Sequence, residues 1–245
     1  MTPLSKSKAK YIKSLQLKKS REKEHRFIVE GNKSVLEFLS SNFIVEEVVG
    51  TEEFYAEMNN NLLPPSNYTC NSKTLSTLGT FKTNNSALAI VQFNEQGPLN
   101  IDKKEVVLAL DEINDPGNLG TIIRVADWYG VKKLLLSKNS VDVYNPKVVS
   151  ATKGSLTRVD VYYTDLPQSM ADYEGEVYAA DMEGTSLSEL NPIDSGIILM
   201  GSESHGVSHS LNSYITKRIT IPRKGGAESL NVAVAAGIIC NHLLS

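Results

Sequence analysis

Residues 105–130 read EVVLALDEINDPGNLGTIIRVADWYG, and this stretch carries the clearest structural pattern in the chain. Residues 105–110 form an almost continuous apolar run, which is typical of a strand buried in a parallel sheet. After a polar loop, Asn118 has the side chain of a helix N-cap, and the helix is expected to run to about Tyr129. Gly130 then stands where a glycine ends a helix. The stretch predicts a strand, a loop and a helix in direct succession.

The same alternation continues to the end of the chain. Further strands are expected at residues 133–136, 159–163, 176–180, 196–200 and 218–221. A final helix is expected over residues 229–244. Strands that alternate with helices form parallel sheets, so the sequence predicts an α/β domain with a mostly parallel sheet and helices on both faces.

A smaller module precedes this domain. The polar segment 94–102 contains Gly97 and Pro98 and has the composition of a linker. Before it, short apolar runs alternate between strand and helix patterns at residues 27–29, 35–39, 44–49 and 87–91. We therefore expect an N-terminal α/β module over residues 1–97 and a second domain over residues 98–245.

The composition excludes several classes of protein. Of the 245 residues, 41% are hydrophobic and 22% are charged, which is ordinary for a globular protein. Cys70 and Cys240 make no disulfide framework and suit a reducing compartment. No apolar run approaches the roughly 18 residues of a membrane helix, and the Lys-rich start lacks a signal-peptide core. We expect a cytoplasmic protein that neither is secreted nor binds a membrane.

Charge is divided unevenly along the chain. The net charge is −3, but residues 1–33 hold ten Lys/Arg and three acidic residues, a net charge of +7 that leaves −10 for the remainder. Such asymmetry is typical of an arm that meets a polyanion. A solvated, partly disordered tail would show the same charge pattern, and composition alone does not separate the two.

Three polar loops follow predicted strands and are rich in Gly and Asn. They span residues 115–120, 201–206 and 222–231. Ligands of open α/β sheets bind outside the carboxyl ends of the strands. Each loop alone could be an ordinary turn, but their recurrence at three strand ends predicts a binding site.

Several common sites are excluded by the same residues. The loops contain neither G-x-G-x-x-G nor the P-loop pattern, so dinucleotide and P-loop nucleotide binding are not expected. They also lack the G-x-S-x-G of a serine hydrolase. Glu203, His205 and His209 lack the H-E-x-x-H spacing and both cysteines are remote, so no metal is expected.

The three loops resemble motifs 1, 2 and 3 of a known family. The matching residues are Asp115-Pro-x-Asn118-x-Gly120-x-x-x-Arg124, Gly201-Ser-Glu203-x-x-Gly206, and Ile221-Pro222 followed by Glu228-Ser-Leu-Asn-Val-Ala233. They are similar to the SpoU/TrmH family, which are S-adenosylmethionine-dependent RNA ribose 2′-O-methyltransferases of the SPOUT superfamily. The N-terminal part, with Phe27-Ile-Val-Glu-Gly31, more loosely resembles the family's substrate-binding module.

The resemblance implies a deep trefoil knot in the C-terminal domain, threaded by the segment after motif 2, and a homodimer with the site close to the subunit interface. It implies that S-adenosylmethionine is bound largely through backbone groups at Gly201, Ile221 and Leu230, with Ala180 in another wall of the pocket. It places catalytic or substrate-contacting residues at Asn118, Arg124, Glu203, Ser229 and Asn231.

Some roles stay open at this point. A guanidinium is normally protonated at any working pH, so we favour Arg124 as an anchor for the phosphate beside the target nucleotide over a general base. Ser229, Asn231 or water would then lie nearer the proton. His205 reads as a loop substitution rather than a proton relay. Trp128 reads as a core or dimer contact rather than a base-stacking platform.

The expected function is methyl transfer from S-adenosylmethionine to a ribose 2′-hydroxyl in structured RNA. The two-module layout favours ribosomal RNA as the partner, and transfer RNA is the alternative substrate. A non-catalytic RNA-binding or assembly protein that retains the knotted fold is the alternative from another class. The complete set of motif residues favours the enzyme.

Overall fold

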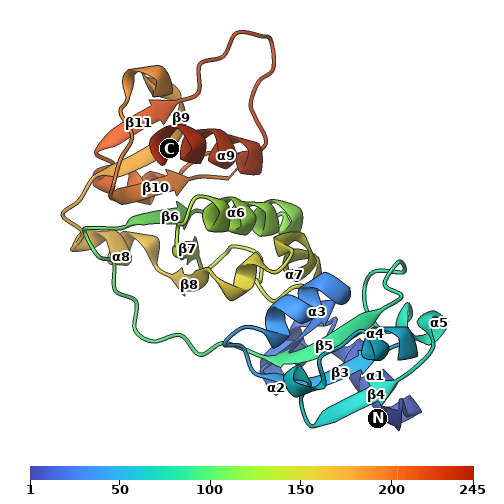
Figure 1. The fold of residues 1–245 in the computed structure, drawn as a ribbon. Helices are drawn as coiled ribbons and strands as arrows, with labels where there is room; N and C mark the ends of the chain where they lie inside the picture. The colour runs from blue at the N-terminus through green and yellow to red at the C-terminus, as the bar shows by residue number, and fades with distance from the viewer. Residues whose placement is uncertain (203) are drawn as a thin grey trace. The chain divides into compact units, whose positions relative to one another are not determined.

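The computed structural model describes residues 1–202 and 204–245. The described chain divides into two compact units (Figure 1). The first unit comprises residues 1–95 and 142–157, and the second unit comprises residues 96–141 and 158–245. The change of unit after residue 95 lies inside the expected linker. Residues 142–157 belong to the first unit although they lie between two strands of the second, which no sequence pattern indicated.

The second unit is built on a parallel sheet, six-stranded in the described residues, with the strand order β11-β9-β10-β6-β7-β8. All five pairings are parallel. The strands are β6 (Val106–Leu110), β7 (Lys133–Ser137), β8 (Asp160–Thr164), β9 (Val177–Ser186), β10 (Gly196–Met200) and β11 (Lys217–Thr220). The predicted α/β fold with a parallel sheet is confirmed. The strand expected at residues 176–180 is longer than predicted, because β9 continues to Ser186.

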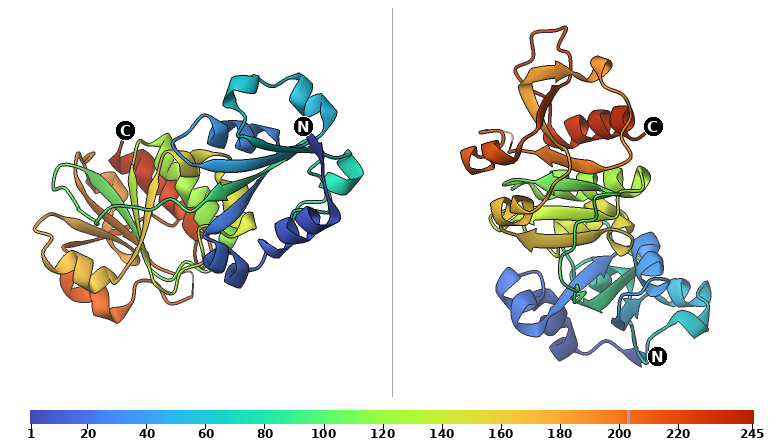
Figure 2. Two further views of the ribbon diagram at one scale, coloured as in Figure 1. Left: turned by 90° about the horizontal axis from the view of Figure 1, so that it is seen from below. Right: turned by 90° about the vertical axis from the view of Figure 1, so that its left-hand side faces the viewer.

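Helices cover both faces of this sheet, as Figure 2 shows. On one side, α6 (Pro116–Trp128) packs against α9 (Val232–Leu243). On the other, α8 (Leu166–Ala171) packs against the 3₁₀ turn η4 (His209–Tyr214). A further 3₁₀ turn, η3 (Leu187–Glu189), follows β9.

The ends of α6 and α9 correct two predictions. Asp115, not Asn118, is the N-cap of α6, since its carboxylate accepts the Asn118 backbone N–H at 2.8 Å. Pro116 takes the first helical position, where its missing N–H costs nothing. The predicted start of α9 at residue 229 is also wrong, because Asn231 caps a helix that begins at Val232. Gly130 has φ +75°, which confirms its place at the end of α6.

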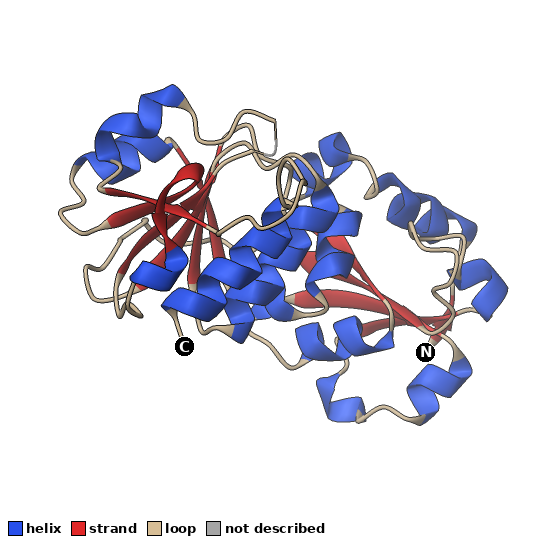
Figure 3. Ribbon diagram, turned by 90° about the horizontal axis from the view of Figure 1, so that it is seen from above, coloured by secondary structure: helices blue, strands red, loops and turns tan. Residues whose placement is uncertain are grey.

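The first unit has a mixed sheet, five-stranded where the structure describes it, in the order β1-β4-β3-β5-β2. β5 pairs antiparallel with β2 and β3, and β4 pairs parallel with β1 and β3. The strands are β1 (Thr2–Pro3), β2 (Arg26–Glu30), β3 (Val45–Gly50), β4 (Ser66–Thr69) and β5 (Ala87–Gln92). The helical segments are α3 (Asn32–Leu39), α4 (Glu52–Ala56), η1 (Asn60–Leu62), α5 (Ser72–Leu75), α7 (Pro146–Thr152) and η2 (Ser155–Thr157). Figure 3 shows helices and strands by colour.

The basic N-terminus is folded. It forms α1 (Lys6–Ser14) and α2 (Lys18–Glu24). Ile12 and Leu15 are fully buried in a core cluster with Ile28 and Ile90. The interpretation of this segment as a partly disordered tail is therefore wrong. Hydrophobic anchoring holds the two helices on the sheet, and it was masked in the sequence by the dense lysines around it.

The segment 142–157 is bound to the first unit by one buried ion pair and a ring stack. Arg21 is only 2% exposed, and its guanidinium forms a salt bridge with Asp142. Tyr144 stacks on Phe93 with 4.1 Å between ring centroids and 16° between ring planes. Across the described ranges, no helix is long and apolar enough to span a membrane.

Candidate functional site

The carboxyl ends of β6 and β10 place the first two loops side by side. The strands are adjacent, with Leu110 opposite Met200, and the Asp111 N–H donates to the Met200 carbonyl at 2.9 Å. Motif 1 leaves β6 and motif 2 leaves β10 at this same edge. The predicted convergence of these two loops follows from parallel pairing.

Motifs 1 and 3 are joined by a hydrogen bond between two predicted site residues. The Asn231 Nδ2 donates to the Asn118 Oδ1 at 2.9 Å, although the residues are 113 positions apart. The Asn231 Oδ1 accepts the backbone N–H groups of Ala233 at 3.0 Å and Val234 at 3.3 Å. The oxygen of Asn231 therefore caps α9 while its amide nitrogen holds Asn118. This arrangement fixes which end of the Asn231 amide points toward motif 1.

Two hydroxyl groups at the end of β7 hold the segment that leads from β6 into the first loop. The Glu112 N–H donates to the Ser137 hydroxyl at 2.7 Å, and the Ile113 N–H donates to the Ser140 hydroxyl at 3.2 Å. Glu112 has φ +55°, an uncommon conformation for a residue other than glycine. Backbone conformation here is thus imposed by hydroxyl acceptors at the end of β7.

Asp111 connects the first loop to the chain after motif 2. Its buried carboxylate accepts the Ser208 N–H at 2.9 Å. Sequence reasoning missed Asp111, Ser137 and Ser140. The usable signal was an Asp directly after a buried strand, because a buried carboxyl group at such a position needs a hydrogen-bond donor.

The motif 2 loop is a tight turn that requires glycine. Ser202 and Gly206 exchange two backbone hydrogen bonds of 3.0 Å, and Gly206 has φ +66°. A Cβ at Gly201 would lie 2.1 Å from the Gly206 carbonyl carbon, so any side chain there would collide with backbone. Glu203 lies outside the described residues. The His205 Nδ1 lies 2.8 Å from the Ser204 hydroxyl, within the same loop.

A large bulge forms next to the third loop. The register of β9 against β11 changes from Ala179 opposite Arg218 to Thr185 opposite Ile219, so residues 180–184 bulge out. Arg218 holds this bulge through an ion pair with Asp181. Ala180, predicted to line a pocket wall, is its first residue.

The third loop runs from β11 to α9 and is the long connection beside α9 in Figure 1. Ile221 is half-buried, whereas residues 222–230 are exposed. Ser229 and Leu230 therefore present their side chains to solvent just before the Asn231 cap. A loop of this exposure has its backbone groups available to a ligand.

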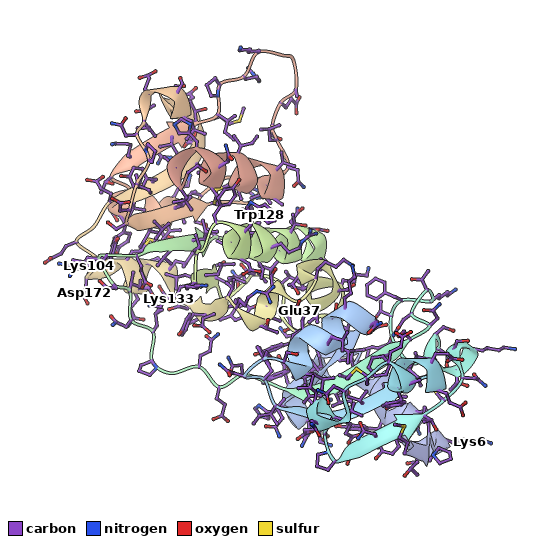
Figure 4. All side chains as sticks on the ribbon, in the orientation of Figure 1. Lys6, Glu37, Lys104, Trp128, Lys133 and Asp172 are labelled. Atoms are coloured by element: carbon purple, nitrogen blue, oxygen red, sulfur yellow. The ribbon has the colours of Figure 1, made fainter. Side chains whose placement is uncertain are left out.

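Arg124 and Trp128 lie one helical turn apart on the outer side of α6. Arg124 is exposed, and among the described residues it forms no ion pair. Trp128 is 83% exposed, which excludes the core role that its ring suggested (Figure 4). Within residues 1–202 and 204–245, no group of three or more His, Cys, Asp or Glu side chains could hold a metal ion.

Comparisons with known proteins match both units. A family model described as the SpoU rRNA Methylase family matches residues 105–241, and one described as an MRM3-like substrate binding domain matches residues 6–89. The chain is 31% identical over 242 residues to the 23S rRNA (guanosine(2553)-2′-O)-methyltransferase RlmP of Bacillus subtilis, which covers 96% of this chain and 95% of that one.

Solved structures match over the full length. A putative RNA methyltransferase of the TrmH family from Porphyromonas gingivalis aligns with a TM-score of 0.85 and 33% identity, covering 98% of both chains. An AdoMet-bound rRNA methyltransferase from Sinorhizobium meliloti aligns with a TM-score of 0.87 and 26% identity, covering 99% of this chain and 96% of that one.

Proposed function

The chain belongs to the SpoU rRNA methylase family, and from this premise we propose that it transfers a methyl group from S-adenosylmethionine to a ribose 2′-hydroxyl in ribosomal RNA. The observation that carries the proposal is the Asn231–Asn118 hydrogen bond of 2.9 Å. It joins two polar side chains of motifs 1 and 3 at the edge where motif 2 also begins. The pair brings residues of two motifs, 113 positions apart in the chain, into one site.

The residues around the loops fit an adenosyl group. Gly201 lies against the Gly206 backbone, which closes the motif 2 loop, and the half-buried Ile221 and exposed Leu230 offer apolar surface beside open backbone groups. We assign these three residues to cofactor binding, with Ala180 at the bulge as a further wall. When bound, the sulfonium supplies the methyl group for an in-line displacement by the ribose oxygen.

The polar residues then orient the ribose and handle its proton. Arg124 would hold the neighbouring phosphate in the planar fork of its guanidinium. The Ser229 hydroxyl and the Asn231–Asn118 pair would fix the 2′-hydroxyl, whose proton would pass to water as the oxygen attacks. We assign Glu203 to substrate contact on the basis of the sequence motif alone. Fixing the reacting atoms in this way accounts for much of the rate of such reactions.

The substrate class is supported by the first unit. Residues 6–89 match a substrate-binding family model, and the full-length relative from Bacillus subtilis is named for 23S rRNA. Shorter matches are named as tRNA/rRNA methyltransferases, which keeps transfer RNA as the second substrate. We expect the reaction to take place in the cytoplasm, where the two cysteines would stay reduced.

We also infer a homodimer formed through α6 and α9. These helices pack together, and their outer sides expose Trp128, Val234 (52%) and Ile238 (39%). Such an apolar face on a helix pair is typical of a subunit interface. Arg124, four residues before Trp128, would then lie at the interface and next to the partner's site. The family's knot would be closed by the segment that Asp111 holds at Ser208.

The experiment that tests the function is mapping of 2′-O-methyl groups in total RNA from cells with and without this protein. The proposal expects one ribosomal position to lose its methyl group and to regain it on incubation with purified protein and S-adenosylmethionine. A position lost in transfer RNA would change the substrate class. No lost position in either RNA would favour the non-catalytic alternative.

A further inference from the structure

The first unit contains a pocket that the methyl transfer does not use. Its volume is about 470 Å³, and it is lined by residues 24–26, 42–44 and 92–95. These residues lie at the start of β2, before β3 and at the end of β5. The strand pairings Arg26–Gln92 and Val45–Val91 bring all three segments to one end of the sheet. A volume of this size falls within the roughly 300–1,000 Å³ of small-ligand sites.

Aromatic rings form part of the pocket wall, and contacts with other aromatic side chains fix their positions. Phe43 and Phe93 line the pocket, and the fully buried Phe27 contacts both, with centroid separations of 6.1 and 6.2 Å. Tyr144 stacks on Phe93 at 4.1 Å. Tyr144 covers one face of the Phe93 ring, so a planar group would stack on its opposite face or on Phe43.

Planar polar groups surround the rings. The Arg26 guanidinium is held by the Glu24 carbonyl at 2.7 Å and by the Glu46 carboxylate. Asn42 and Asn94 are exposed lining residues, with amide groups that can both donate and accept hydrogen bonds. Amides and guanidinium groups beside aromatic rings are what proteins use to read unpaired nucleobases.

The pocket lies at the end of a basic helix. His25 ends α2 with φ +51°, and its ring meets Phe93 edge-on at 5.8 Å between centroids. Lys18, Lys19 and Lys23 on α2 are exposed, and Lys18 pairs with Glu22 while Lys23 pairs with Glu24. Because Glu24 and Glu95 also line the pocket, its chemistry suits the stacking and hydrogen bonding of a base rather than the binding of a phosphate.

We propose that this pocket binds an unpaired nucleobase of the RNA substrate, stacked against the Phe43 and Phe93 wall with His25 at its edge. This inference rests on the proposed function, since it names how the substrate is recognised outside the reacting ribose. The base would be splayed from a loop or bulge, because a paired base offers no free face for stacking.

The test uses the full chain and a short single-stranded RNA that contains one 2-aminopurine, whose fluorescence is quenched on stacking. We expect quenching by the wild-type chain. In Phe43→Leu we expect less quenching and about 5- to 100-fold weaker binding, the usual range for removal of one base–aromatic stack, and in His25→Ala a smaller loss of both, because His25 lies at the edge of the base. Phe43→Leu keeps an apolar side chain at the position, and His209→Ala, at an exposed histidine of the second unit, is the matched control.

Salt dependence separates base stacking from phosphate binding. Removal of a stack lowers affinity at every salt concentration and leaves the slope of log affinity against log salt unchanged, whereas removal of a cation that binds a phosphate flattens it. Unchanged quenching and affinity in both variants would overturn the proposal. Displacement of the RNA by free adenosine monophosphate at equal concentration would also overturn it, in favour of a mononucleotide site.

The result is independent of methyl transfer. If the chain methylates RNA but no quenching depends on His25 or Phe43, the pocket proposal fails and the proposed function stands. If quenching depends on them but no RNA is methylated, the proposed function fails and the pocket remains an RNA site of a non-catalytic protein.

Discussion

The two units use arginine in opposite ways. In the first unit, Arg21 is 2% exposed and donates to the Leu15 and Gln16 carbonyls at 3.1 and 2.8 Å as well as to Asp142. In the second unit, Arg124 is exposed on the outer side of α6. The comparison shows that Arg21, with its donors paired inside the protein, is a structural residue. Arg124 presents its guanidinium outward, where it can meet a phosphate.

The largest effect is expected from replacing Arg21, the buried arginine of the first unit. Arg21→Ala removes the donors of Asp142 Oδ2 and of two carbonyls, although Asp142 Oδ1 keeps the Tyr144 N–H. Removal of one partner of such a buried pair typically costs about 3–5 kcal/mol of unfolding free energy. Urea denaturation followed by circular dichroism measures this loss. The double variant Arg21→Met with Asp142→Leu removes both charges and should recover most of it. A loss below about 1 kcal/mol in Arg21→Ala would show that the pair does not hold residues 142–157.

Replacing Arg124, the exposed arginine of the second unit, should lower the methylation rate and leave the stability of the fold nearly unchanged. Arg124→Lys removes the planar fork but keeps the charge, so the single-turnover methylation rate with saturating RNA and S-adenosylmethionine should fall about 10- to 100-fold, as expected when a charge-assisted hydrogen bond is removed. The unfolding midpoint serves as the internal control and should shift little, because lysine keeps the positive charge and an aliphatic stem at this position. A full rate in Arg124→Lys would remove the anchor role.

The basic helices offer a third comparison, between lysines that are engaged and lysines that are not. Lys8 pairs with Glu47 at 2.9 Å, whereas Lys6, Lys10 and Lys13 are exposed and share one face of α1. Deleting residues 1–26 would remove the buried Ile12 and disrupt the core, so neutralisation is the sharper experiment.

Changing Lys6, Lys10 and Lys13 to Gln should weaken RNA binding and reduce the slope of log affinity against log salt by roughly 0.7–0.9 for each phosphate that these lysines neutralise. Calorimetric affinity for S-adenosylmethionine should be unchanged. The matched control neutralises three exposed lysines of the second unit, Lys104, Lys132 and Lys138. Equal slopes in the two triple variants would mean that α1 makes no special interaction with RNA.

Sequence patterns predicted the second unit better than the first for a physical reason. The strand–loop–helix of residues 105–130 is local, so apolar runs and Gly130 fix it within a few residues. The Asn231–Asn118 hydrogen bond and the Arg21–Asp142 pair join residues far apart in the chain, and no local period indicates such interactions. The bulge at residues 180–184 was missed because a change of register leaves the apolar pattern of β9 intact. The sequence could have identified Asp115 as the N-cap of α6, since an Asp followed by Pro is typical of the start of a helix.

The smallest effect is expected from a comparison of two glutamates of the first unit, Glu46 and Glu30. The hydrogen bond that Glu46 accepts from Arg26 lowers the pKa of Glu46. Burial raises the pKa of Glu30, although Glu30 accepts the Thr80 and Phe81 N–H groups. Glu46 therefore contributes stability that is present above pH 4.5 and is lost as pH falls through its lowered pKa. Glu30 contributes in the opposite sense, since its neutral form is favoured in the fold, and stability falls as pH rises above 4.5 toward its raised pKa.

Urea midpoints measured from pH 3 to 7, a range that brackets the ordinary pKa of a glutamate, would separate the two groups. Glu46→Gln should remove a loss of about 1 kcal/mol or less at the acidic end, the usual size for a partly exposed ion pair. Glu30→Gln should instead remove the decline above pH 4.5, because an amide has no ionised form to desolvate at that buried position. If both variants shifted the pH profile in the same direction, the hydrogen bond from Arg26 would not be the cause of the lowered pKa of Glu46. The fixed position of Arg26 in the wall of the first unit's pocket would then need another explanation.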